Sequence, residues 1–164
     1  MNIASAAAKI SHAIVVAVTL VLVLGYVATA YLGAGFAVVE GSSMEPLLHT
    51  GDLVLLTKKP PEDVEVGDIV VYSWGGKYVI HRVIHKYVSP QGEVCIVTKG
   101  DNNVLPDLGD PASCGTVIIP GVGLASGRPY SDVVGVVVEV AGAPVKVPYV
   151  GVIRILLEDA GILR

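Results

Sequence analysis

The chain has 164 residues, of which 52% are hydrophobic and only 16% are charged, and its formal net charge is −4. This composition excludes a disordered chain, a coiled coil and a highly charged cytosolic binding protein. It also argues against nucleic acid as a partner, because phosphate binding needs clustered Lys and Arg. A membrane protein or a very apolar β protein remains, with room for one compact domain and an appendage.

An uncharged run near the N-terminus predicts a single transmembrane helix. Residues 10–39 contain no Asp, Glu, Lys or Arg. A bilayer core about 30 Å thick needs about 20 apolar helical residues, and residues 13–32 supply them. A cleaved secretory signal and a buried core helix are the alternatives, but the run is longer than the usual signal core of about 7–15 residues.

The charges on either side of this run predict its orientation. Lys9 precedes it, whereas Glu40 and Glu45 follow it. The positive-inside tendency therefore places the N-terminus in the cytoplasm and the rest of the chain outside the cell membrane. We accordingly expect a cytoplasmic N-terminus and transmembrane anchor in residues 1–35 and an extracytoplasmic, β-rich catalytic domain in residues 36–164.

The body of the chain is expected to be mainly β, a sandwich or a partly open barrel. Short β-branched segments are separated by Gly, Pro and Asp, which is typical of such folds. The last segment, 150–163, has helix-like apolar spacing and is expected to pack on the sheet or lie on the membrane. A strand begins at 36–39; further expected strands are 53–57, 68–73, 78–85, 93–98, 116–120 and 133–140, with loops at 104–115 and 121–128.

The two cysteines, Cys95 and Cys114, leave two possibilities open. Outside the cell they can form a disulfide that closes a loop of about 20 residues. Otherwise they are two buried free thiols. No CxxC motif or His/Cys cluster suggests a metal site, so we expect neither a metal nor another cofactor.

Three segments contain residues suited to nucleophilic catalysis. A serine in the Gly- and Pro-bounded turn at 40–46 is exposed, and neighbouring N–H groups can converge on one point. His81, in the strand at 78–85, is the candidate base that takes the proton of the serine. A carboxylate in 98–107 can orient that histidine. Taken singly, these features equally fit an ordinary turn, a half-buried histidine and an Asp-rich turn.

Taken together, these segments resemble the type I signal peptidases. The family's order is kept by S-M-E-P at 43–46, I-H-R-V at 80–83 and K-G-D-N-N with a later Asp at 99–107, all after an N-terminal anchor. The histidine, where bacterial members carry Lys, is similar to the archaeal and endoplasmic-reticulum branch, as is V-P-Y-V-G at 147–151. The resemblance covers roughly residues 10–155.

The resemblance implies a role for each matching residue. Ser43 matches the nucleophile, His81 the general base and Asp107 the acidic residue implicated in catalysis. Asp101 matches a nearby aspartate whose role is less defined, either structural or orienting.

One departure from the family pattern affects the oxyanion hole. Gly41 stands where many members have a serine whose hydroxyl helps to form the hole. The backbone N–H of Ser43 then carries more of that task, or Ser42 substitutes. Ser42 is also the alternative nucleophile.

The implied function is a membrane-anchored serine endopeptidase with a signal-peptidase-like β fold. It removes N-terminal signal peptides from secreted preproteins after small residues at substrate positions −1 and −3, with membrane lipid and the protein translocon as further partners. The alternatives are a specialised processing peptidase of the same fold, a serine peptidase with Lys77 or Lys99 as base, and a non-catalytic, membrane-anchored β module that binds peptides.

Overall fold

The computed structural model describes residues 3–161, with the side chains of residues 9–27 and 33–161. It divides between Ala34 and Gly35 into a helical unit (Met1–Ala34) and a β unit (Gly35–Arg164). Because the described residues end at 161, the last two residues of the expected helical segment 150–163 lie outside them.

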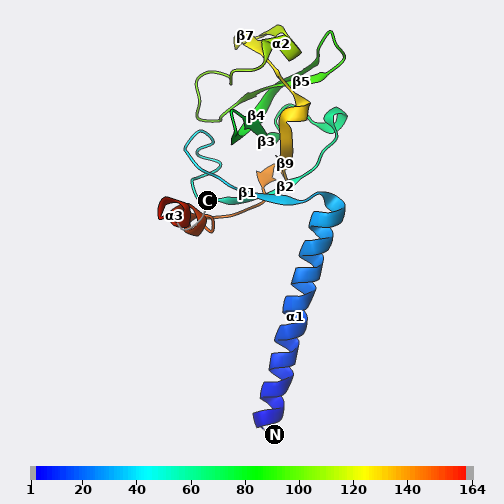
Figure 1. Cartoon of the computed structure of the whole chain (residues 1–164), viewed down its shortest axis with the longest axis vertical. Coiled ribbons are helices and arrows are strands. Elements are labelled where there is room, and N and C mark those ends of the chain that lie inside the picture. The colour runs from blue at the N-terminus through cyan, green and yellow to red at the C-terminus, as the bar shows by residue number, and fades with distance from the viewer. Residues whose placement is uncertain (1–2, 162–164) are drawn as a thin grey trace. The chain divides into compact units, whose positions relative to one another are not determined.

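The helical unit consists of α1 (Ile3–Leu32) (Figure 1). Within it, Lys9–Val27 is long and apolar enough to cross a membrane, with a mean hydropathy of 2.4, and none of this stretch is buried. The helical unit thus agrees with the expected membrane anchor.

The β unit is built on one antiparallel sheet, so the prediction of a mainly β fold is confirmed. In spatial order its strands are β1 (Gly35–Val38), β2 (Leu53–Thr57), β9 (Val133–Val137), β3 (Ile69–Trp74), β4 (Lys77–Val88), β5 (Val94–Lys99) and β8 (Arg128–Pro129), and β12 (Lys146–Val147) also pairs with β2. Two small hairpins are added, β6 (Thr116–Ile119) with β7 (Gly123–Ser126) and β10 (Glu139–Val140) with β11 (Ala143–Pro144). The short helices are η1 (Pro61–Asp63), α2 (Pro111–Cys114), η2 (Tyr130–Asp132) and α3 (Val152–Asp159).

Strand β3 is apolar along most of its length because both of its faces are buried. Ile69 and Val71 pack into one apolar cluster, whereas Val70 and Tyr72 pack into another. Successive side chains of a strand point to opposite faces, so both faces of β3 are covered by other parts of the chain. A strand covered on both sides is read from sequence as a continuous apolar run.

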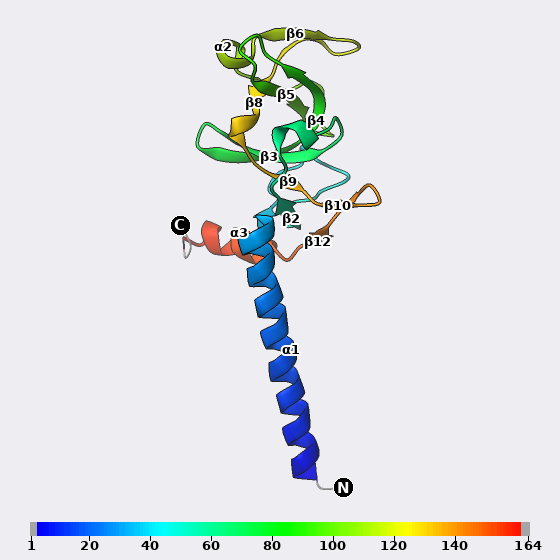
Figure 2. The ribbon, with the colours of Figure 1, turned by 90° about the vertical axis from the view of Figure 1, so that its right-hand side faces the viewer.

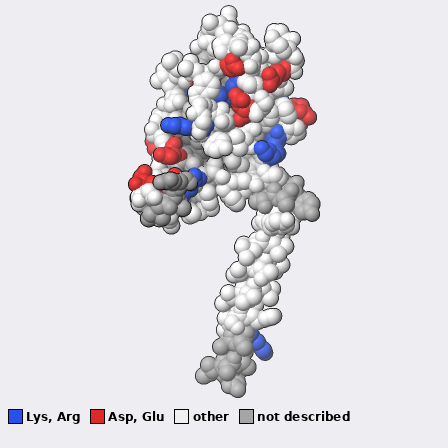
Figure 3. Space-filling model, viewed as in Figure 1, with Lys and Arg blue, Asp and Glu red and all other residues white. Residues whose placement is uncertain are grey.

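Figures 1 and 2 agree on how the elements of the β unit are arranged. Strands β1 and β2 lie near α3 at one end, and α2 lies with the β6–β7 hairpin at the other. Figure 3 shows acidic and basic side chains intermixed on the visible face of this unit.

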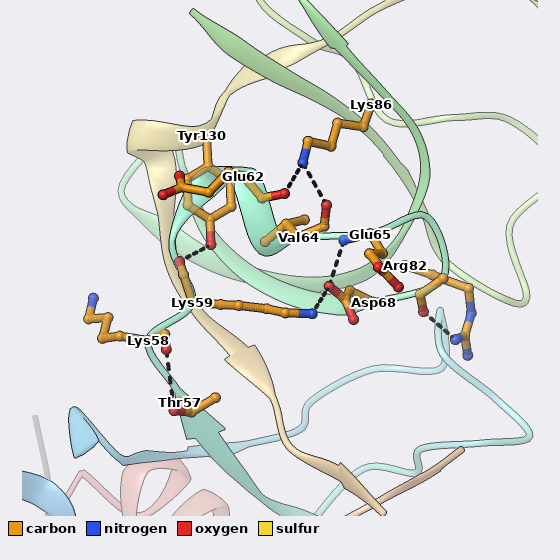
Figure 4. A network of polar contacts seen from close by, with 11 residues as sticks. Thr57, Lys58, Lys59, Glu62, Val64, Glu65, Asp68, Arg82, Lys86 and Tyr130 are labelled. Atoms are coloured by element: carbon orange, nitrogen blue, oxygen red, sulfur yellow. Dashed lines mark hydrogen bonds and ion pairs between the residues drawn. The ribbon is translucent and has the colours of Figure 1, made fainter. Parts of the chain in front are cut away.

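Two lysine side chains form hydrogen bonds and an ion pair with the segment between β2 and β3 (Figure 4). The Lys86 ammonium donates to the carbonyl oxygens of Glu62 and Val64, at 2.8 Å in each case. The Lys59 ammonium pairs with the Asp68 carboxylate at 2.7 Å. These contacts fix the start of β3, which is one of the strands beside the candidate site.

Two expectations about the second half of the β unit need correction or completion. The segment 121–128 is not a loop, because it contains β7 and the start of β8. Its glycines suggested irregular structure. Gly121 instead lies in the turn of the β6–β7 hairpin and Gly123 is the first residue of β7, with φ of +77° and +102°. Cys95 and Cys114 form a disulfide.

Candidate active site

Ser43 lies on the serine loop, which we define as residues 39–52 between β1 and β2. The ends of the loop are closed by backbone hydrogen bonds from Val39 to Asp52 and from Gly51 to Val39, both 2.8 Å. Met44 is 1% exposed and packs in the first apolar cluster. Burial of the side chain that follows Ser43 fixes the position of the serine on the body of the protein.

Ser43, His81 and Asp107 form a continuous chain of hydrogen bonds. Ser43 Oγ lies 2.9 Å from His81 Nε2, and His81 Nδ1 lies 2.6 Å from Asp107 Oδ2. An ionised carboxylate can only accept hydrogen bonds, so Nδ1 of the neutral ring carries the proton and Nε2 accepts from the serine hydroxyl. This is the tautomer that a general base needs.

Two of the three residues come from neighbouring strands or the segment after one of them, and Ser43 comes from a loop farther away in the sheet. His81 lies on β4 opposite Val70 of β3, and Asp107 follows β5, which pairs with β4 on its other side. The sheet places β2, β9 and β3 between β1 and β4. The contact of Ser43 with His81 therefore joins parts of the chain whose strands are not neighbours in the sheet.

Asp107 is surrounded by hydrogen-bond donors. Thr98 Oγ donates to its Oδ2 at 2.6 Å and Tyr72 Oη at 2.9 Å, in addition to His81. Burial raises the pKa of the Asp107 carboxyl, but the hydrogen bonds from His81, Thr98 and Tyr72 outweigh burial and hold the pKa below its ordinary value. Asp107 is therefore ionised at neutral pH and able to orient His81.

The K-G-D-N-N segment holds the serine loop from the side of β5. Asn102 donates its backbone N–H to the Ser43 carbonyl at 2.8 Å and its side-chain amide to the Ser42 carbonyl at 3.1 Å. A Cβ at Gly100 would lie only 2.6 Å from the Ser43 carbonyl oxygen. Glycine at this position thus allows the close approach of the two segments.

Asp101 is not part of the hydrogen-bonded chain. Both of its carboxylate oxygens accept from Arg82, from Nε at 2.8 Å and from Nη2 at 2.7 Å. Arg82 also donates Nη1 to the Gly67 carbonyl at 2.8 Å (Figure 4). Because Arg82 follows His81 on β4, this bidentate pair holds the segment after β5 against the strand of the histidine.

The alternative nucleophile and the alternative bases are not part of the hydrogen-bonded chain. Ser42 is exposed, and it is Ser43, not Ser42, whose hydroxyl meets the imidazole. The Lys99 ammonium donates to the carbonyls of Gly100 and Asn103. Lys77 is exposed and lines the groove described next, but its ammonium makes no hydrogen bond to the serine among the described residues.

A groove of about 860 Å³ passes Ser43. One wall comes from β1, which lies at the edge of the sheet, and another from the β3–β4 hairpin and α3. Its lining is mostly apolar: Phe36, Ala37, Val38, Leu56, Val71, Val79, Ile80, Val134 and Ile155, with Glu40, Gly76, Lys77, Tyr78, Arg154 and Glu158 as further members.

The sequence motifs did not reveal Tyr72, Thr98 or Asn102. Thr98 precedes the K-G-D-N-N segment directly, so its position beside Asp107 was open to a prediction from the motif. Tyr72 was not, because it meets Asp107 only through the pairing of β3 with β4 and of β4 with β5.

The chain is similar to signal peptidase subunits along most of its length. A family model described as Peptidase S24-like matches residues 14–106. Signal peptidase complex catalytic subunit sec11 of Pyrenophora teres f. teres is 31% identical over 156 residues, which cover 94% of this chain and 81% of the relative. Signal peptidase complex catalytic subunit SEC11C of Homo sapiens is 33% identical over 102 residues, or 61% of this chain.

The extent of these matches shows the family. The chain spans about half the length, 53%, of the mammalian SEC11C relatives, but most of the fungal relative. The family match includes Ser43 and His81 and ends one residue before Asp107. The chain therefore belongs to the Peptidase S24-like family, in the branch of type I signal peptidases that contains the SEC11 catalytic subunits.

Proposed function

We propose that this chain is a membrane-anchored serine endopeptidase that removes N-terminal signal peptides from secreted preproteins. The observation that carries the proposal is the chain of hydrogen bonds from Ser43 through His81 to Asp107 beside an apolar groove. The names of the relatives, which are catalytic subunits of a signal peptidase complex, support the choice of substrate.

In the proposed reaction, Ser43 Oγ attacks the scissile carbonyl carbon while His81 Nε2 takes the hydroxyl proton. Asp107 stabilises the imidazolium that forms. The imidazolium then gives its proton to the leaving amine, and the C–N bond breaks to leave an acyl-enzyme. A water molecule, deprotonated by His81, hydrolyses the ester and restores the serine.

The oxyanion of the tetrahedral intermediate needs a donor close to Ser43. We assign this task to the backbone N–H of Ser43, which donates to no acceptor within the part of the chain that the structure describes. Gly41 brings no hydroxyl here, and its N–H and carbonyl are both bonded to the Thr50 hydroxyl at 3.0 Å.

The groove suits an extended peptide segment. Strand β1 is at the edge of the sheet, so a substrate segment can add to it through main-chain hydrogen bonds. The resemblance to the type I signal peptidases implies small residues at positions −1 and −3 of the substrate, and the apolar lining beside Ser43 supports apolar ones. We further propose that the enzyme acts at the cell membrane, beside the translocon, with its N-terminus in the cytoplasm and the β unit outside.

Cleavage of a preprotein by the full chain in detergent tests this proposal. Ser43→Ala and His81→Ala are each expected to lower the rate at least about 10³-fold, because the members of such a triad act as a unit. Ser42→Ala is the matched control and should keep most of the activity. Sequencing the new N-terminus of the product locates the cleavage site.

Two results would contradict the proposal. A folded Ser43→Ala variant with full activity would place the nucleophile elsewhere. Loss of activity in Ser42→Ala with retention in Ser43→Ala would exchange the two serines. If the chain is instead a non-catalytic peptide-binding module, neither the wild type nor any variant cleaves the preprotein.

A further inference from the structure

Arg128 is a buried cation that the proposed reaction does not use. Its side chain is 2% exposed, and no carboxylate of the described residues forms an ion pair with it. Burial of a guanidinium without a counter-ion is costly unless other contacts compensate. One of its terminal nitrogens, Nη1, has no hydrogen-bond partner among the described residues.

The contacts of Arg128 lead to the candidate active site. Its guanidinium carbon lies 3.7 Å from the ring centroid of Tyr72 and 4.9 Å from that of Trp74. Cation–π contacts of a desolvated guanidinium are favourable at these distances. Its Nη2 donates to the carbonyl of Leu108, the residue after Asp107, at 2.8 Å.

Tyr72 in turn contacts two members of the hydrogen-bonded chain. Its hydroxyl lies 2.9 Å from Asp107 Oδ2, and its ring meets the His81 ring edge to face with centroids 6.4 Å apart. Burial and the charge of Asp107 raise the pKa of Tyr72, with Arg128 opposing them, so the hydroxyl stays protonated and donates.

We propose that Tyr72 and Arg128 are positioning residues that hold the Asp107 carboxylate toward His81. Arg128 fixes both the ring of Tyr72 and the backbone next to Asp107, and the Tyr72 hydroxyl fixes the carboxylate itself. This inference rests on the proposed function, because it assumes that Asp107 orients the catalytic histidine.

Tyr72→Phe tests the role of the hydroxyl. We expect kcat for preprotein cleavage to fall about 10-fold with KM nearly unchanged, because a hydrogen bond to a charged group is lost outside the peptide-binding groove. The acid limb of the kcat profile should also move to higher pH, because the Asp107 carboxylate, with one donor fewer, makes the His81–Asp107 pair take up a proton more readily.

Tyr130→Phe is the matched control. Tyr130 packs against the same apolar cluster as Tyr72, and its hydroxyl donates to the Lys59 carbonyl at 2.7 Å. It makes no hydrogen bond to Asp107. Its loss should leave kcat and the pH profile unchanged, whereas a merely structural role for both hydroxyls would affect the two variants alike.

Arg128→Met removes the charge and the planar stack, and Arg128→Lys keeps the charge. We expect kcat to decrease from wild type to Arg128→Lys to Arg128→Met. The double variant that combines Tyr72→Phe with Arg128→Met should be no slower than Arg128→Met alone. Such non-additivity is the mark of residues that act through one route. A double variant whose loss of kcat equals the product of the two single losses would overturn the proposed route. A Tyr72→Phe variant with the kcat and pH profile of the wild type would do the same.

A spectroscopic readout separates failure of this inference from failure of the proposed function. The proton in the short hydrogen bond between His81 Nδ1 and Asp107 is expected to give a downfield NMR signal, which can be recorded without turnover. We expect Tyr72→Phe to shift or broaden it and Tyr130→Phe to leave it in place. An unchanged signal in Tyr72→Phe overturns the inference, whereas a fully active Ser43→Ala overturns the proposed function.

Discussion

Two aspartates six residues apart, Asp101 and Asp107, occupy different environments. Asp107 accepts from His81 and is largely buried, whereas Asp101 forms a bidentate pair with Arg82 in which the two side chains are 22% and 29% exposed. The first carboxylate touches the reacting imidazole. The second holds two segments of backbone together.

This difference predicts unequal effects of the same substitution. Asp107→Asn should lower kcat about 10⁴-fold, because an amide cannot hold the imidazole in the required tautomer. Asp101→Asn should lower the free energy of unfolding by about 1 kcal/mol, as for a partly exposed ion pair, and change kcat only a few-fold. Preprotein cleavage and thermal unfolding of both variants measure these quantities.

The opposite pattern has a clear meaning. Equal losses of kcat in the two variants, at equal stability, would give Asp101 a direct part in the reaction. A stable and active Asp107→Asn variant would remove the carboxylate from the proposed mechanism.

The residues of the hydrogen-bonded chain were predictable because the motifs place them beside recognisable neighbours. Ser43 precedes Met44 in S-M-E-P, and His81 stands within I-H-R-V. The donors around Asp107 were not predictable in the same way. Tyr72 is 35 residues from Asp107 in the chain, and only the register of three paired strands brings them together.

At the level of elements, the C-terminal segment braces the serine loop. The Lys146 ammonium of β12 pairs with the Asp52 carboxylate at 2.6 Å and donates to the Leu47 carbonyl at 2.8 Å. The Gly151 N–H donates to the Gly51 carbonyl at 2.9 Å. The V-P-Y-V-G motif at 147–151, which the sequence associated only with a branch of the family, therefore connects these contacts: it directly follows Lys146 and ends at Gly151.

The pKa of Asp52 gives this brace a pH dependence. Burial raises the pKa of its carboxyl, but Lys146 and the backbone N–H groups of His49 and Tyr149 outweigh burial and hold it below 3.8. A folded-state pKa below the unfolded value stabilises the protein above pH 3.8. That contribution is lost as the pH falls through the lower, folded-state value.

Lys146→Met is therefore expected to destabilise the protein by roughly 3 kcal/mol at neutral pH, because it leaves a buried carboxylate without its cation. The difference from wild type should shrink as the pH falls, because burial without the cation lets Asp52 of the variant take up a proton first, whereas Asp52 of the wild type does so only below pH 3.8. Denaturant unfolding at pH 7, 5 and 3 measures it.

Lys58→Met is the control for this change. The Lys58 ammonium donates to the Val134 carbonyl and pairs with no carboxylate of the described residues. Its effect should be small and independent of pH. A Lys146→Met variant with the same small effect would mean that the ion pair does not hold the serine loop.

The elements themselves were predicted unevenly. The expected strand 53–57 coincides with β2, since an apolar run follows a Gly-Asp turn there. The β6–β7 hairpin was missed in part because Gly-rich sequence predicts a turn without specifying whether strands flank it. The expected strand 78–85 is longer in the structure, where β4 runs from Lys77 to Val88, and its pairing with β5 shifts register between Val83 and His85.

The whole molecule combines an apolar helix and a β unit joined by Gly33 and Ala34. The low charged fraction of the chain has two causes in this organisation, the unburied span Lys9–Val27 and a sheet whose central strand is buried on both faces. An anchor of this kind makes sense for an enzyme whose proposed substrates are themselves held in a membrane.

The proposed anchoring predicts how the rate depends on membrane area. In vesicles, enzyme and preprotein share the bilayer, and confinement raises their effective concentration without any new contact. Adding lipid at fixed amounts of both should dilute them, so about 10-fold more lipid should slow preprotein cleavage about 10-fold.

A short soluble peptide that contains only the cleavage site is the matched substrate. It reaches the enzyme from water, so added lipid should leave its cleavage rate unchanged while its kcat/KM stays well below that of the preprotein. Equal responses of the two substrates to lipid would mean that α1 does not place the enzyme and the signal helix in one layer. The binding energy for preproteins would then have to come from the groove beside Ser43 alone.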